Sequence, residues 1–127
     1  MIRDRALKVV LVLVGLLFAA AAYPAVSAIW HQDHSDTGDS MMMGIYATLG
    51  VFILLAVRNP SAHRSLIAFA AWSSFAHGVV MSLLGLQIPS ERDGFLIGSA
   101  VLVVIGIVLL ALAPPKPSIA LASAARD

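Results

Sequence analysis

The sequence predicts an all-α fold: a four-transmembrane-helix bundle with both termini in the cytoplasm. Two observations support this prediction, the composition of the chain and the placement of its charges. Of the 127 residues, 60% are hydrophobic and 12% are charged, whereas a soluble domain usually carries about 25% charged residues. A water-soluble fold of this length could not bury so much apolar surface. Composition therefore excludes an ordinary soluble enzyme or nucleic-acid module, and the absence of cysteine excludes thiolate metal sites.

Four long apolar stretches divide the chain, at 6–30, 41–57, 65–88 and 94–113. A hydrocarbon core of about 30 Å needs about 20 helical residues, within a range of about 17–25. Helices are expected because the alternating pattern of membrane strands is absent and unpaired backbone is not tolerated in lipid. No repeat divides the chain, so residues 1–127 form one integral membrane domain.

The first two stretches are separated by a polar, acidic loop at 31–40. Pro24 lies within the first stretch and should bend its helix, because proline has no backbone N–H. The basic start and the run Val26-Ser27-Ala28 also fit a cleavable secretory signal, which is the rival interpretation of this segment. The second stretch is near the lower length limit for spanning, and Ser40 is its expected N-cap.

The third stretch is the most polar and the fourth carries no charge. A turn at 58–61 precedes the third, with Ser61 as its expected N-cap. The row Ala70, Ser74, Gly78, Ser82 would let another helix approach closely. Gly94, Gly98 and Gly106 lie on roughly one face of the fourth stretch, and a proline pair follows it.

Basic residues predict the orientation of these spans. A four-span topology places seven of the eight on one side: Arg3, Arg5, Lys8, Arg58, Arg64, Lys116 and Arg126. Arg92 lies on the other side with most of the acidic residues. The positive-inside rule therefore places both termini in the cytoplasm, and the slightly basic balance gives no support to a nucleic-acid partner.

His77 is the first candidate functional residue, because it lies near the middle of the third span, where an ionisable group is costly. The simpler interpretation is a neutral imidazole bonded to a helix serine, a backbone carbonyl or Thr48 on the second span. A cofactor is the alternative. His63 and His77 are about 21 Å apart along one helix, a spacing that resembles the paired histidines of dihaem cytochromes b.

Haem b at His63 and His77 would need a facing histidine for each iron, and no other span contains one. A parallel homodimer that joins two third spans could supply these ligands. A purified protein without a Soret band would exclude haem.

The acidic loop is the second candidate site, with His31, Asp33, His34 and Asp36 as expected metal ligands directly before three methionines. Imidazole with thioether suits copper, and imidazole with carboxylate suits zinc. A calcium loop is excluded because Gly44 stands where its final bidentate acid is needed. The simpler interpretation is that these acidic residues only solvate the loop and follow the charge distribution that the membrane topology requires.

The run MMMGIYATLGVFILLAVRNPSAHRSLIAFAAWSSFAHGVVM at 41–81 resembles a bacterial family of small uncharacterised four-helix membrane proteins. The start RALKVVLVLVGLLF and the ending ALAPPK are similar too, so the resemblance covers most of the chain. That family carries a domain of unknown function. The resemblance implies a four-helix fold in the bacterial inner membrane, and it implies no activity and no site residues.

The expected function is that of a small inner-membrane protein of unknown activity, most simply a non-enzymatic subunit that packs with itself or a larger membrane complex. No nucleophile-base pair or phosphate-binding loop is present to suggest an enzyme. A haem- or metal-binding protein is the first alternative. A small-solute channel or carrier is the second, with a polar path at Thr48, Ser73, Ser74 and His77.

Overall fold

The computed structural model describes residues 2–32, 34–116 and 125–126, and these residues form helices joined by short loops. In chain order the helices are α1 (Ile2–Ala19), α2 (Ala22–Trp30), α3 (Thr37–Ala56), the 3₁₀ helix η1 (Pro60–His63), α4 (Arg64–Gln87) and α5 (Arg92–Leu112). No strand occurs among the residues described. The all-helical fold is confirmed.

Four segments are long and apolar enough to cross a membrane: Ile2–Trp30, Thr37–Ala56, Pro60–Gln87 and Arg92–Leu112. They correspond to the four apolar stretches of the sequence. The number of membrane-capable segments is therefore confirmed, whereas the side on which the termini lie stays a prediction.

The first segment is interrupted just before Pro24. Because Pro24 has no N–H, the carbonyl of Ala20 accepts from the N–H of Tyr23 instead, at 3.1 Å. The N–H of Ala21 bonds to the carbonyl of Phe18 at 3.1 Å. These tighter bonds end α1 at Ala19 and start α2 three residues later.

Both expected serine caps are corrected by the structure. Helix α3 begins at Thr37, and Asp36 caps it: its Oδ1 accepts from the Asp39 N–H at 2.9 Å. Ser40 lies inside the first turn and donates to the Asp36 carbonyl. Ser61 lies within η1, and no side chain caps either η1 or α4.

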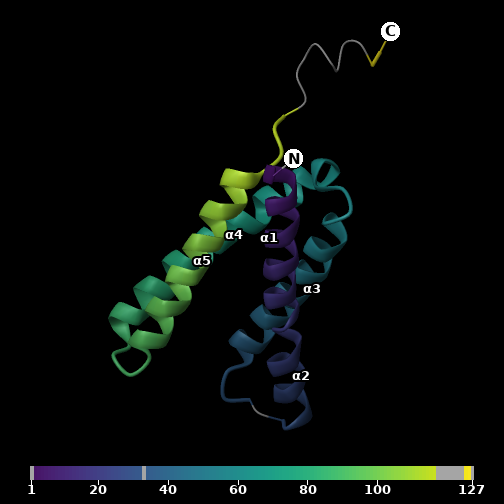
Figure 1. Ribbon diagram of the computed structural model, residues 1–127. Coiled ribbons are helices and arrows are strands. Elements are labelled where there is room, and N and C mark those ends of the chain that lie inside the picture. The colour runs from purple at the N-terminus through teal and green to yellow at the C-terminus, as the bar shows by residue number, and fades with distance from the viewer. Residues whose placement is uncertain (1, 33, 117–124, 127) are drawn as a thin grey trace.

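The helices associate as two pairs, α1 with α3 and α4 with α5, and α2 packs beside α3 (Figure 1). Gly15 and Gly50 allow the first pair to cross closely. A Cβ added at Gly50 would press on the backbone of Gly15, Phe18 and Ala19. Glycine at this position is required because backbone atoms cannot move aside as a side-chain end can.

The small-residue row of the sequence forms the seam between α4 and α5. Ser99 Oγ donates to the Gly78 carbonyl at 2.7 Å and lies 2.6 Å from Ser82 Oγ. The single Ser99 proton is used at Gly78, so Ser82 donates the second bond. Gly98 faces Met81. The row is therefore occupied by α5, and a homodimer could not use it without displacing that helix.

The hydrophobic core lies mainly in the half of the molecule that carries the N-terminus and Pro114, which we call the terminal half. Its buried side chains come from all four segments: Leu7, Leu11, Val14, Phe18, Leu49, Ile53, Ile67, Ala70, Ala71, Ile105 and Leu109. In the opposite half, the loop half, the two pairs diverge (Figure 1). The four helices therefore pack as a compact bundle only over part of their length.

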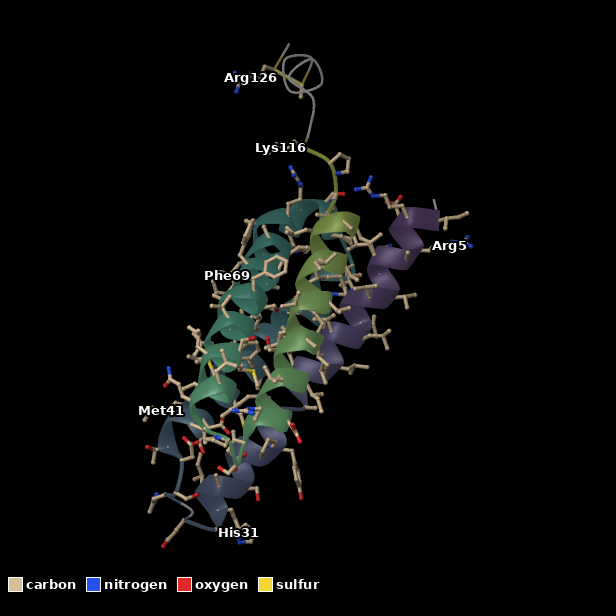
Figure 2. All side chains as sticks on the ribbon, turned by 90° about the vertical axis from the view of Figure 1, so that its left-hand side faces the viewer. Arg5, His31, Met41, Phe69, Lys116 and Arg126 are labelled. Atoms are coloured by element: carbon tan, nitrogen blue, oxygen red, sulfur yellow. The ribbon has the colours of Figure 1, made fainter. Side chains whose placement is uncertain are left out.

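Two arginines join the helices at the terminal end. Arg3 Nη2 donates to the carbonyls of Ala111 and Ala113 at 3.2 and 3.1 Å. Arg64 Nε donates to the Pro114 carbonyl at 2.8 Å. The last carbonyls of a helix have no partner within it, and a cation there also complements the helix dipole. Figure 2 shows Arg5 and Lys116 near this end and His31 and Met41 near the other.

Candidate functional site

The most distinctive polar contact between the helix pairs joins His77 to Tyr46. His77 Nδ1 lies 2.8 Å from the Tyr46 hydroxyl, and both side chains are half-buried. The phenol donates to an unprotonated Nδ1, or a protonated Nδ1 donates to the phenol oxygen. Either arrangement gives a polar group in the middle of a membrane-capable helix a hydrogen-bond partner.

Aromatic packing holds Tyr46 in place. Its ring meets that of Phe18 at a centroid distance of 4.9 Å and an interplanar angle of 89°. The centroid of the His77 ring lies 5.1 Å from that of Tyr46. Edge-to-face contacts of this kind stabilise ring pairs beyond simple burial. The contacts therefore run from α1 through α3 to α4.

A second span at 41–57 places Thr48, and not Tyr46, near the depth of His77, so the sequence pattern did not indicate Tyr46 as its partner. With the helix starting at Thr37, Tyr46 lies nine residues after that start and His77 ten residues before the end of α4 at Gln87. Antiparallel helices place such positions at matching depth. The sequence signal that could have indicated this helix start is Asp36, which is a favourable N-cap residue.

The expected hydroxyl partners of His77 bond within their own helices. Thr48 Oγ1 donates to the Gly44 carbonyl at 3.0 Å, and Ser73 and Ser74 both donate to the Ala70 carbonyl. Ser74 is fully buried, whereas Thr48 is exposed. Of the three, Ser73 alone lines a groove together with His77, whereas Thr48 and Ser74 line neither of the grooves described below.

Two grooves lie beside the contact between Tyr46 and His77, mainly in the loop half, and the larger one extends along α4 as far as Phe69. The larger groove, of about 640 Å³, is lined mainly by α3 and α4, and the smaller, of about 350 Å³, is lined by all the long helices. The residues common to both are Asp39, Met42, Tyr46, His77 and Met81. The grooves therefore occupy the space that opens where the helix pairs diverge.

The walls of the larger groove follow helical periodicity. On α3 the lining positions include 39, 42, 46 and 49, and on α4 they include 73, 77, 80 and 84. Spacings of three and four residues place each set on one helix face. Ten residues of α3 correspond to about 15 Å of length, so the groove is long, and most of its lining side chains are apolar.

Charge in the groove lies at its loop end. Asp36 and Asp39 line the larger groove, and Asp39 also lines the smaller one. No lysine or arginine lies among the described residues that line either groove. The grooves therefore combine an apolar body, a central pair of hydrogen-bonding groups and an acidic mouth.

His63 does not lie in the same helix as His77. It ends η1, is exposed, and directly precedes α4 at the terminal end. Within the described part of the chain, the ring bonded to His77 is a phenol and not a second imidazole. The structure therefore does not bring together a haem ligand pair, and the haem hypothesis still depends on a second copy of the chain.

The predicted metal loop has one member, Asp33, outside the described residues. His31 and His34 are exposed, and Asp36 serves as the α3 cap. Within residues 2–32, 34–116 and 125–126, no three histidine, aspartate or glutamate side chains form a group that could hold a metal ion. The capping bond accounts for Asp36 without a metal.

The fold and its groove define a class of protein: a small, all-helical chain with four membrane-capable segments and a half-open interior. The chain belongs to the Family of unknown function (DUF6632), whose family model matches residues 2–121. No curated protein and no solved structure matches it. The resemblance to a family carrying a domain of unknown function is confirmed.

Proposed function

We propose that this chain is a multi-pass protein of the bacterial cytoplasmic membrane, with both termini in the cytoplasm. Its role is that of a subunit that associates, within the membrane, with other copies of itself or with a larger membrane complex. One observation carries the proposal. In the most apolar stretch of each spanning segment, at most 28% of the residues are buried inside the chain. Most of the apolar surface therefore faces lipid or partner helices.

Large apolar side chains are exposed along every long helix, including Leu13 on α1, Phe52 on α3, Val79 on α4 and Val104 on α5. Such surface is stable only in lipid or against another apolar surface. Interaction through these faces needs no reactive group. The basic side chains at the terminal end supply the charge bias from which we infer the orientation.

Cysteine accessibility tests the topology, because the natural chain contains no cysteine. Ser61→Cys places a thiol in η1 at the terminal end, and Ser90→Cys places one between α4 and α5. In intact spheroplasts a membrane-impermeant maleimide should label the second variant, and should label the first only after permeabilisation. The reverse pattern would overturn the orientation.

Photo-crosslinking tests the association. A benzophenone maleimide is attached to single cysteines at Leu13, Gly44, Val79 or Val104, which are exposed on four different helices. We expect irradiation of native membranes to produce a discrete higher-mass band from at least one position. Uncrosslinked monomer at all four positions would contradict a subunit role.

A further inference from the structure

We propose that the space between the helix pairs in the loop half binds a single-chain amphiphilic cation, with its ammonium head at Asp39 and its apolar chain along Tyr46, His77 and the neighbouring hydrophobic side chains. The proposal concerns a small ligand held within one chain. It does not depend on whether the protein associates with itself or with other subunits.

The shape of the space indicates a slender ligand. The larger groove runs about 15 Å along α3 and has a volume of about 640 Å³. It is open toward the side of the molecule and is walled by two helix faces, so a single alkyl chain can enter between α3 and α4 without displacing the core. The core lies mainly in the other half, and the groove reaches its edge at Leu49.

The side chains of the walls favour an apolar body with a polarisable or cationic end. Met42 and Met81 line both grooves, and methionine adapts its shape to an irregular apolar guest. Phe69 and Phe95 also line the larger groove. Aromatic faces attract an alkylammonium group as well as alkyl carbon.

Charge complementarity selects a cation. The carboxylates of Asp36 and Asp39 lie at the loop end of the groove, and no basic side chain among the described lining residues opposes them. Asp36 is already used as the α3 cap through Oδ1, so Asp39, exposed on the first turn, is the main contact for the head. An anionic phospholipid would place its net negative charge against these two carboxylates, which disfavours it.

Equilibrium dialysis with radiolabelled dodecyltrimethylammonium tests the proposal. The full-length protein is reconstituted in phosphatidylcholine nanodiscs, and empty discs measure partitioning into lipid. We expect saturable binding above that of the empty discs. Dodecanol, which has the same chain and no charge, should bind at least about fivefold more weakly, because only the cation gains Coulomb attraction from the carboxylates at the mouth of the groove.

Matched variants locate the ligand. Asp39→Asn should weaken binding about fivefold or more, while Glu91→Gln, which removes a carboxylate at the same end of the molecule but outside both grooves, should leave it unchanged. Ala76→Trp should abolish binding by filling the larger groove. Val79→Trp adds the same bulk to an exposed position of α4 outside the grooves and should have no effect.

Three results would overturn the proposal: no saturable binding above empty discs, equal binding of dodecanol, or binding that Ala76→Trp leaves intact. Helix content by circular dichroism and elution volume show whether each variant is folded. If Asp39→Asn proves misfolded, the comparison of dodecanol with the cation on the natural chain still decides the selectivity.

Discussion

At the scale of single residues, the sequence indicated that His77 needs a hydrogen-bond partner but did not indicate which residue that partner is. A histidine in the middle of a spanning helix has to find a hydrogen bond, and the structure supplies Tyr46 rather than a serine or Thr48. Two features of α3 decide this. The helix starts at Thr37, and Tyr46 shares a face with the core residues Leu49 and Ile53, whereas Thr48 points away from it.

Replacing the Tyr46 hydroxyl should loosen the contact between the helix pairs. Tyr46→Phe keeps the ring contacts with Phe18 but leaves His77 Nδ1 without the phenol, and we expect a loss of about 1 kcal/mol in the free energy of unfolding. Unfolding by sodium dodecyl sulfate, followed by circular dichroism, measures it. The control is Tyr23→Phe, because Tyr23 is 81% exposed. Equal stability of both variants would show that the Tyr46 hydrogen bond contributes nothing.

At the scale of helices, local chemistry explains where each one begins, bends and ends. The first segment is interrupted just before Pro24, which lacks an N–H, and Asp36 starts α3 with a side-chain bond. The small residues of α4 were recognisable as a packing face, yet their partner was not, because small residues suit any close neighbour. Only the structure shows that Ser99 and its neighbours on α5 occupy that face.

The crossing of α1 and α3 should tolerate no side chain at Gly50. Gly50→Ala would force a Cβ onto the α1 backbone, and overpacking of this kind costs about 1–3 kcal/mol. Gly44→Ala is the matched control on the same helix, since its Cβ would meet nothing within 4 Å. It should be neutral or slightly stabilising, because alanine favours helix. The same unfolding measurement applies, and equal stability of the two variants would contradict the close crossing.

At the scale of the whole molecule, the uneven distribution of the core is the main finding. Buried apolar residues and the two arginine contacts hold the helix pairs together in the terminal half. In the loop half, their contact includes the hydrogen bond between Tyr46 and His77, with grooves beside it. Regions with few buried contacts open most easily, so motion between the pairs should be concentrated at the loop end.

Electron-spin distance measurements can test this difference in mobility. Spin labels at Met41 and Leu86 report on α3 and α4 at the loop end, and labels at Leu55 and Ser65 report on the same helices at the terminal end. We expect a broad distance distribution for the first pair and a narrow one for the second. Tyr46→Phe should broaden the loop-end distribution further. Equally narrow distributions at both ends would contradict the prediction.

The sequence by itself determined the all-helical fold and the number of membrane-capable segments, because both depend on apolar runs and on where charges and prolines interrupt them. Membership of a family of unknown function also followed from the sequence. Only the tertiary structure decided that α5 occupies the small face of α4, that Tyr46 is the partner of His77, and that the helix pairs diverge to leave a groove with an acidic mouth. The physical reason is that periodicity identifies the face a helix uses for packing, whereas the neighbour that meets it depends on how all the helices fit together in space.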